Sequence, residues 1–357
     1  MDKTIDLFKA RDIVTIREAV RKMDEGGLGF ICIVNSQDQV IGVVSNGDFR
    51  RAVLKGVSID RPVTDIMNAQ FKSLKAGFTQ AQALDLVMNS PAQHIPVLDD
   101  GKMIGLVNVE DFLPKDRNRY FRENCAIPLV VMAGGQGTRL VPFTNILPKP
   151  LMPLGDKSVI EHILSEFSSF GIQDVIISIN HKNRIIKAYF EELKDSHKVR
   201  FITEDKPLGT AGSLRMMKSM INTPFFLTNC DVLVKANYWE IFDFHQGKGF
   251  DMTMVVAQKK YVIPYGVCHI QHEGDLDRID EKPELDLLIN TGIYVINPSI
   301  FNMIPDGEIF NMDALIIALR KSGKKIGVFP VDEKCFLDIG QLDEYRAALQ
   351  KIELFSA

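Results

Sequence analysis

The sequence predicts an α/β domain built on a mainly parallel, mixed sheet, preceded by a smaller α+β module. After residue 127, short apolar runs alternate with amphipathic segments of helical period, a pattern typical of parallel strands covered by helices. Before residue 120, one set of elements occurs twice. We therefore predict domains at 1–120 and 127–357 with a linker at 121–126, and repeats within the first domain at about 1–58 and 59–120.

Each N-terminal repeat is predicted to contain a helix, two strands and a second helix. The segments Thr15–Met23 and Thr79–Met88 place apolar residues at helical spacing after a capping threonine. The predicted strands, two in each repeat, are Ile31–Val34, Val40–Val44, Ile95–Leu98 and Met103–Val107. A second helix is expected to begin near Asp48 in the first copy and near Asp111 in the second.

This arrangement resembles the tandem CBS (cystathionine-β-synthase-type) module. In that family a Ser/Thr-x-x-Asp sequence at the end of the second strand helps to hold the ribose of an adenine nucleotide, and Ser45 with Asp48 matches it. The second copy has Asn108 in place of the hydroxyl residue, before Asp111. The resemblance implies Ser45, Asp48 and Asp111 as nucleotide ligands. The alternative is that the two aspartates only cap helices and the module is structural or oligomerising.

The C-terminal domain is predicted to alternate strands with helices. The expected strands are Leu129–Ala133, Asp174–Ile179, Val199–Ile202, Phe225–Thr228, Met252–Ala257, Gly266–Ile270, Ile289–Ile296 and Ile326–Val331. The expected helices are Ser158–Phe170, Asn183–Leu193, Thr210–Met220, Asn237–Gly247, Asp313–Lys321 and Gln341–Ile352. Ligands of such folds lie at the carboxyl ends of the strands.

The composition of the chain argues against nucleic-acid binding, membrane insertion and metal binding by cysteines. The chain has 357 residues and a net charge of −4, without a basic tract, so nucleic-acid binding is not expected. No apolar run approaches ~18 residues and the first residues are charged, which predicts a cytoplasmic protein without a membrane partner. The five cysteines are scattered without metal-ligand spacing, so we interpret them as reduced packing residues.

A glycine-rich loop follows the first strand of the C-terminal domain. The apolar run 129–132 leads into Gly134, Gly135, Gln136 and Gly137, where backbone N–H groups can approach a phosphate. Two cations follow, Arg139 and a lysine, Lys149, that stands between two prolines. The loop matches neither a Walker sequence nor G-x-G-x-x-G, and the spacing of the two cations makes it a strong candidate for a phosphate site.

Further segments extend this pattern in a fixed order: GGQGTRL and PKPL are followed by EDKPLGTAG, LTNCDVL, YGV, EKP, NTGIYVIN and FLDIG. Together they resemble the sugar-1-phosphate nucleotidylyltransferases. The resemblance implies a Rossmann-like nucleotidyltransferase fold. It also implies a reaction in which a sugar-1-phosphate attacks the α-phosphorus of a nucleoside triphosphate and releases pyrophosphate.

The same resemblance assigns roles to individual residues. Arg139, Lys149 and Asp231 are the implied catalytic residues, and Asp231 with Asp338 is implied to hold one Mg²⁺. The implied nucleotide-binding residues are Gly134, Gly135, Gly137, Thr138, Glu204, Gly209 and Thr210. The implied sugar-phosphate residues are Gly266, Glu281, Lys282, Asn290 and Thr291.

Glu204 is the candidate for reading the base. Guanine offers two adjacent donors that a carboxylate can bridge, whereas a pyrimidine edge is better matched by an amide. The segment EDKPLGTAG, which begins at Glu204, also resembles the GDP-mannose pyrophosphorylase branch. We therefore favour GTP over UTP, dTTP and CTP. The alternative is that Glu204 faces solvent and the backbone near Gly209 reads the base.

CBS domains ahead of this catalytic domain resemble the guanylyltransferases that make GDP-glucosamine from glucosamine-1-phosphate, for legionaminic (nonulosonic) acid and surface-glycan synthesis. The alternatives are a mannose-1-phosphate guanylyltransferase and a glucose-1-phosphate uridylyl- or thymidylyltransferase. A non-enzymatic alternative is a regulatory subunit that binds a nucleotide sugar. We expect a homo-oligomer in each case.

Overall fold

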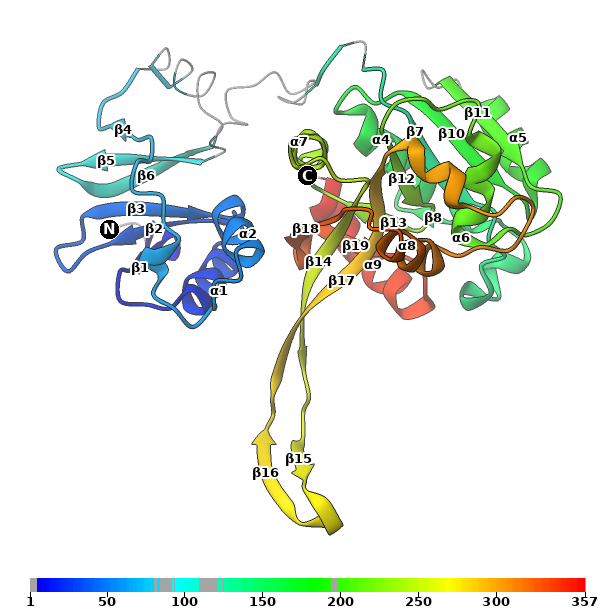
Figure 1. Cartoon of the computed structure of the whole chain (residues 1–357). Coiled ribbons are helices and arrows are strands. Elements are labelled where there is room, and N and C mark those ends of the chain that lie inside the picture. Colours follow the sequence, from blue (N-terminus) through cyan, green and yellow to red (C-terminus); the bar gives the residue numbers. More distant parts are fainter. Residues whose placement is uncertain are drawn as a thin grey trace. The chain divides into compact units, whose positions relative to one another are not determined.

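The computed structural model describes residues 5–79, 82–83, 86, 92, 94–108, 121–123, 125–193 and 198–356. The chain forms two compact units, residues 1–119 and 120–357 (Figure 1). Each unit has apolar cores of its own, so each is described by itself.

The N-terminal unit contains two three-stranded sheets of the same design. In each, a short strand pairs in parallel with the first strand of an antiparallel hairpin. The strands are β1 (Lys9–Arg11), β2 (Phe30–Val34), β3 (Val40–Ser45), β4 (Leu74–Lys75), β5 (His94–Asp99) and β6 (Lys102–Asn108). The two hairpins match the predicted strands, whereas β1 and β4 are too short for a hydrophobic period to reveal them.

Helices α1 (Ile16–Gly26) and α2 (Asn46–Leu54) both begin with capping boxes. Thr15 and Glu18 bond each other's backbone N–H groups at α1, and Ser45 and Asp48 do the same at α2. The capping interpretation of Asp48 is therefore present in the structure. The helix predicted at Asp111 and most of the one predicted over 79–88 lie outside the described residues.

The C-terminal unit is organised on a seven-stranded sheet of order β11-β10-β7-β12-β17-β14-β18. Strands β11, β10, β7 and β12 are mutually parallel, β14 and β18 are parallel, and β17 is antiparallel to both its neighbours. The predicted mainly parallel, mixed sheet is thus confirmed. The bounds are β7 (Leu129–Ala133), β10 (Asp174–Ile179), β11 (Lys198–Thr203), β12 (Phe225–Asn229), β14 (Met252–Val262), β17 (Glu284–Ile296) and β18 (Ile326–Asp332).

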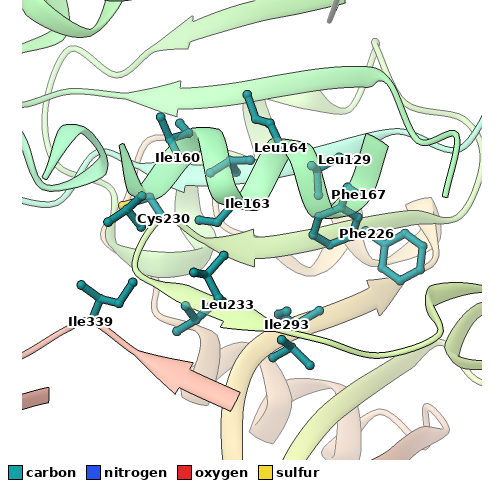
Figure 2. Packing of buried hydrophobic residues seen from close by; sticks show 14 of the residues in the cluster. Leu129, Ile160, Ile163, Leu164, Phe167, Phe226, Cys230, Leu233, Ile293 and Ile339 are labelled. Atoms are coloured by element: carbon teal, nitrogen blue, oxygen red, sulfur yellow. The ribbon is translucent and has the colours of Figure 1, made fainter. Parts of the chain in front are cut away.

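Alternate residues of the central strand β7 enter two different apolar clusters. Leu129 and Val131 pack with helix α4 (Val159–Ser168), and Val130 packs with Leu214 on the other side of the sheet. Figure 2 shows α4 lying over the sheet, where the ring of Phe167 meets Phe226 edge-on with centroids 5.5 Å apart. Burial on both faces explains why this strand is continuously apolar.

Five of the six predicted C-terminal helices are present with small changes at their ends. They are α4 (Val159–Ser168), α5 (Asn183–Glu192), α7 (Tyr238–Lys248), α8 (Met312–Lys321) and α9 (Leu342–Ser356). The helix predicted over 210–220 is instead a single turn, α6 (Gly209–Gly212), followed by a 3₁₀ helix, Ser213–Met217. The N–H groups of Ala211 and Gly212 donate to the Phe310 carbonyl, which ties the first turn of this segment to a distant part of the chain.

Strands β14 and β17 are longer than predicted and continue beyond the sheet as a two-stranded ribbon. The ribbon ends in the hairpin β15 (Gly266–Ile270) and β16 (Leu276–Glu281). We call residues 258–288 the arm; Figure 1 shows it projecting from the sheet. The strand predicted for β14 ended at Ala257 and the one predicted for β17 began at Ile289, near the points where buried side chains give way to exposed ones. The strand predicted over Gly266–Ile270 is present as β15.

Two short antiparallel pairs complete the unit. They join β8 (Pro153–Leu154) to β9 (Lys157–Ser158) and β13 (Val232–Val234) to β19 (Phe336–Asp338). The 3₁₀ helices are Ile5–Phe8, Val63–Asp65, Thr138–Leu140, Phe143–Asn145, Lys149–Leu151, Ser213–Met217, His272–Gly274, Pro298–Met303 and Glu333–Cys335. Within the part of the chain that the structure describes, no helix combines the length and apolar character needed to cross a bilayer.

Candidate active site

The glycine-rich loop begins where β7 ends, at the edge of the sheet where the parallel strands have their carboxyl ends. Gly137 has a φ of +68°, and an ideal Cβ there would lie 2.8 Å from Thr144 Cγ2 and 3.3 Å from Lys149 Cβ. The Thr144 hydroxyl also donates to the Gly137 carbonyl over 2.8 Å. Both the backbone conformation and the close packing therefore require glycine at this position.

The other two glycines of the loop differ in their surroundings. A Cβ at Gly134 would lie 2.8 Å from Glu204 Oε1, whereas one at Gly135 would meet nothing within 4 Å. Gly134 is required by packing against the protein, and the space over Gly135 is open to a ligand. Thr138 and Arg139, which follow in a short 3₁₀ helix, are both exposed.

Lys149 lies directly beside this loop and is nearly buried. It begins a 3₁₀ helix between the buried rings of Pro148 and Pro150, and its side chain is 11% exposed. Its ammonium forms an ion pair with the carboxylate of Asp231, itself 14% exposed. The two prolines hold the backbone, so the charge has a defined position.

Asp231 and Asp338 are brought together by the pairing of β13 with β19. Val232 is opposite Asp338 in the ladder, and the Ile339 N–H donates to the Asp231 carbonyl over 2.8 Å. An ideal Cβ at Gly340 would lie 2.8 Å from Asp338 Oδ1 and 3.2 Å from Asp231 Oδ2. Carboxylates from two distant segments therefore flank a residue that has no side chain.

This pair of carboxylates fits the requirements of a magnesium ion. Hard carboxylate oxygens are the ligands that Mg²⁺ prefers, and it commonly takes only one or two from the protein with phosphate and water supplying the rest. A side chain at Gly340 would crowd one oxygen of each carboxylate, and glycine avoids that contact. Within the described residues there is no group of three or more His, Cys, Asp and Glu placed to hold a metal.

Cys230, next to Asp231, is buried in the apolar core. Burial raises the pKa of its thiol to about 12, and the charge of Asp231 acts in the same direction, while Lys149 acts against it. The thiol therefore stays protonated near neutral pH, whereas the thiolate is the reactive form. Figure 2 shows Cys230 among apolar neighbours, which is the packing role expected from the sequence.

Glu204 is buried, with 5% of its surface exposed, so the alternative in which it faces solvent is wrong. Its Oε1 accepts a hydrogen bond of 2.7 Å from the Ser178 hydroxyl, and its Oε2 accepts one of 3.0 Å from the Leu208 N–H. The carboxylate holds together the ends of two neighbouring strands behind Gly134. Its role in reading a base stays a prediction.

Gly209 and Thr210 connect the site to the start of α8. The Thr210 hydroxyl accepts a hydrogen bond of 2.8 Å from the Met312 N–H, and a Cβ at Gly209 would lie 2.7 Å from the Phe310 carbonyl oxygen. Gly209 also has a φ of +80°. Both residues therefore have a structural role that does not depend on a bound nucleotide.

The implied sugar-phosphate residues fall into two groups. Asn290 and Thr291 lie on the sheet, where the Thr291 hydroxyl donates to the Val255 carbonyl and the Asn290 amide donates to the Tyr294 hydroxyl. The neighbouring Gly292 approaches Asn229 at the end of β12, since a Cβ there would lie 2.6 Å from Asn229 Nδ2. This group is therefore beside the strand that leads to Asp231.

The second group, Gly266, Glu281 and Lys282, lies on the arm. Gly266 is opposite Glu281 in the β15–β16 ladder, and Lys282 follows at once. The structure places these residues at the far part of the arm, away from the loop after β7 (Figure 1). Within a single chain, then, the predicted sugar-phosphate residues are not all brought to one place.

One further acidic residue, Glu344, belongs to this region and was not predicted. Its Oε2 is buried and has no hydrogen-bond partner among the residues described. Burial and the charge of Asp338 raise its carboxyl pKa, while Lys259 and Arg139 act to lower it. The carboxylate also accepts a hydrogen bond from the Gln341 backbone at the start of α9, and no motif in the sequence singled this residue out.

Comparison with known proteins agrees with this arrangement. Residues 129–354 match the family model described as nucleotidyl transferase, and residues 4–55 and 63–116 each match that of the CBS domain. The solved structure of HddC from Yersinia pseudotuberculosis has a TM-score of 0.50 and 26% identity, covering 63% of this chain and 99% of that one.

Curated relatives carry the name mannose-1-phosphate guanyltransferase. The protein from Yarrowia lipolytica is 33% identical over 183 residues, covering 49% of this chain and 50% of its own length. That from Kluyveromyces lactis is 30% identical over 225 residues, covering 60% and 62%. The chain thus spans half to three fifths of the length of these relatives. Because the matching family model covers more than half of the chain, the protein belongs to the nucleotidyl transferase family and carries two CBS domains.

Proposed function

We propose that the protein transfers a nucleoside monophosphate from a nucleoside triphosphate to a sugar-1-phosphate and releases pyrophosphate. The observation that carries this proposal is the convergence of Lys149, Asp231 and Asp338 beside the loop Gly134–Gly137. Amides and a nearly buried cation suit a polyphosphate, and two carboxylates suit its metal ion. Transfer of this kind needs mainly positioning and neutralised charge, which these groups supply.

Each group has a separate task in this reaction. The loop amides and Arg139 bind the triphosphate, and Lys149, oriented by Asp231, neutralises charge that builds up on the α-phosphate. The sugar phosphate oxygen attacks the α-phosphorus, and the bond to the β-phosphate breaks so that pyrophosphate leaves. Mg²⁺, held by Asp231 and Asp338, would supply further neutralisation of phosphate charge.

We infer that the preferred substrates are GTP and glucosamine-1-phosphate, in a route to nonulosonic (legionaminic) acid or other surface glycans. The names of the curated relatives support guanine, and the CBS domains ahead of the family domain support the narrower assignment. Glu204 stays our candidate for reading the base, because each carboxylate oxygen has a second lone pair. Mannose-1-phosphate guanylylation and glucose-1-phosphate uridylylation or thymidylylation are the alternatives.

A substrate matrix tests this proposal. GTP, UTP, dTTP and CTP are each combined with glucosamine-, N-acetylglucosamine-, glucose- and mannose-1-phosphate in the presence of Mg²⁺, and released pyrophosphate is measured. We expect the highest kcat/KM with GTP and glucosamine-1-phosphate. Equal rates with UTP would contradict the guanine assignment, and no pyrophosphate in any combination would contradict the activity itself.

A further inference from the structure

The arm leaves two strand edges open. Strand β14 pairs with β18 only as far as Gln258, and β17 pairs with β12 only from Ile293 onward. Between these points and the tip, the described strands pair only with each other. A two-stranded ribbon without further cover is marginally stable in water, and open edges favour pairing with another chain.

The arm also exposes many apolar side chains. Tyr265 is 74% exposed and Ile270 is 71% exposed at the tip. Further apolar residues of the arm that are more than two fifths exposed are Tyr261, Val262, Leu276, Ile279, Leu285, Leu287 and Leu288. Apolar side chains grouped in this way on one projecting element mark an interaction surface rather than scattered surface hydrophobics.

A second exposed apolar segment lies beside the candidate active site. Between the glycine-rich loop and Lys149, the side chains of Val141, Phe143, Ile146 and Leu147 are exposed, and Ile146 is 76% exposed. The segment is held close to the site, because Thr144 within it bonds to Gly137. An apolar element that docks on residues 141–147 is thereby brought next to the phosphate loop.

The arm carries polar groups suited to a sugar phosphate. Glu281 folds over Gly266, whose ideal Cβ would lie 3.0 Å from Glu281 Oε2. The next residue, Lys282, has a φ of +46°, a conformation that a residue with a long side chain rarely adopts and that occurs often at functional sites. A carboxylate beside an ammonium can bind the hydroxyls and the phosphate of such a ligand.

The ladder between β14 and β17 argues against this arm reaching its own site. From Lys259 opposite Leu287 to Val262 opposite Glu284 the register is regular, and the one register shift of this pair, between Met254 and Val256, lies inside the sheet. Folding the arm back would break ladder hydrogen bonds that hold it extended.

We propose that the arm docks on a second copy of this chain, packs its apolar side chains over residues 141–147 of that copy, and completes that copy's sugar-phosphate site with Glu281 and Lys282. This inference rests on the proposed function. Reciprocal exchange of two arms closes a symmetric dimer, and each active site then combines the loop of one chain with the arm of the other. The arm's open edges and apolar surface become covered in the same step.

Mixed dimers of the full chain test the exchange. The variant Lys149→Ala is inactive in the site but has an intact arm, and the double variant Glu281→Ala/Lys282→Ala has an intact site and a defective arm. The two variants are co-expressed with different tags, and mixed dimers are purified through both tags. In such a dimer, one of the two active sites combines an intact Lys149 from one chain with an intact arm from the other. We expect each variant alone to lose at least about 10²-fold in kcat/KM, and the mixed dimer to recover about half of the wild-type rate.

A matched pair controls for nonspecific rescue. Lys149→Ala mixed with Asp231→Asn places both defects in the body of the protein, so no intact site forms and no rate is recovered. If the wild-type protein is active but the mixture of Lys149→Ala with Glu281→Ala/Lys282→Ala is inactive, the proposed exchange of arms is wrong, while the proposed function stands. Full activity of the Glu281→Ala/Lys282→Ala variant would likewise overturn it.

Sedimentation equilibrium tests the docking surface without reference to activity. Ile146→Glu places a charge on the proposed docking segment and is expected to weaken the dimer at least about tenfold. Ile317→Glu, on an exposed position of α8, is the matched control and is expected to leave the dimer unchanged. A monomeric wild-type protein, or equal behaviour of the two variants, would overturn the proposal. Because this measurement needs no substrate, it also separates failure of the arm from failure of the function.

Discussion

At the scale of single residues, the candidate site depends on opposite charges held close together and away from water. Lys149 and Asp231 are both nearly buried, and each provides the other's counter-charge. Removing one member leaves the other as an uncompensated charge, which is more costly than losing an exposed pair. A bound polyphosphate offers Lys149 a second set of negative oxygens, so the pair is suited to a ligand rather than to stability alone.

Replacing Lys149 with alanine is expected to lower kcat by about 10² to 10³ with the fold intact, because one pre-organised cation next to the transferred phosphate is lost. Steady-state kinetics and circular dichroism measure the two properties together. Lys157→Ala, which removes an exposed lysine from β9, is the control and is expected to keep wild-type kcat. A near-normal kcat in Lys149→Ala would exclude Lys149 from catalysis.

Glu166 provides a prediction of pH dependence. Burial raises the pKa of its carboxyl from 4.5 to about 7, with Lys235 acting in the opposite direction. The folded protein then binds more protons than the unfolded chain between these values, so this group makes the free energy of unfolding fall as pH rises from 4.5 to about 7. Above that range its unfavourable contribution is constant.

We expect Glu166→Gln to remove this dependence, because glutamine does not ionise. At pH 8 the variant should be more stable than wild type by on the order of 1 to 3 kcal/mol, and at pH 4 the two should be nearly equal. Urea denaturation at a series of pH values measures the difference. A constant difference at all pH values would show that ionisation of Glu166 is not its cause.

At the scale of elements, local sequence explains where several helices begin. The Ser158 hydroxyl accepts the Glu161 N–H, and Glu161 accepts the Ser158 N–H over 2.7 Å, which starts α4 directly over the sheet. The Ser158 hydroxyl donates a second hydrogen bond of 2.8 Å to the Glu161 carboxylate, and the Tyr189 hydroxyl donates a third. The cap therefore also connects α4 to α5, so its loss should destabilise more than the first turn of α4.

Ser158→Ala is expected to lower the free energy of unfolding by about 1 kcal/mol, since it removes the side-chain acceptor of an N-cap. Urea titration should show a lower midpoint with the same slope. Ser165→Ala, an exposed position within the same helix, is the control and should change stability by less than about 0.5 kcal/mol. Equal effects of the two substitutions would argue against the cap.

At the scale of the whole molecule, the two units have separate cores, which is expected to separate their unfolding. Ile31 is fully buried in the N-terminal unit and Phe226 in the C-terminal one. Ile31→Ala should lower the unfolding free energy of the N-terminal unit by about 2 to 5 kcal/mol. The calorimetric transition of that unit then moves to a lower temperature, while the transition of the C-terminal unit is unchanged. Phe226→Ala should do the reverse. A single transition that both variants shift equally would contradict independent units.

The same separation gives a test for the CBS domains. An adenine nucleotide bound near Ser45 and Asp48 should stabilise only the N-terminal unit. At a nucleotide concentration of 100 times Kd, the unfolding free energy of that unit should rise by about 2.7 kcal/mol. Differential scanning calorimetry with ATP or AMP measures this shift, and CTP serves as the control. Since Ser45 and Asp48 already bond each other in the α2 cap, no shift would favour a purely structural role for them.

Prediction from sequence succeeded where a pattern is local and the burial is complete. The run from Leu129 to Ala133 is apolar throughout, so strand β7 was identified from its composition alone. It failed for β1 and β4, which are too short for a period, and for the outer halves of β14 and β17, which are not buried. It also could not show that both oxygens of Glu204 are bonded to Ser178 and Leu208, because those partners are set by the register of the sheet.

The sequence by itself determined the family, the order of the elements and which residue types the site contains, since these depend on periodicity and on motifs of short range. Only the tertiary structure decided which of those residues meet. It joins Asp231 to Asp338 through a β-pair between distant segments, and it carries Glu281 and Lys282 away on the arm. The physical reason is that the pairing and register of strands are set by contacts across the chain, and no local pattern records them.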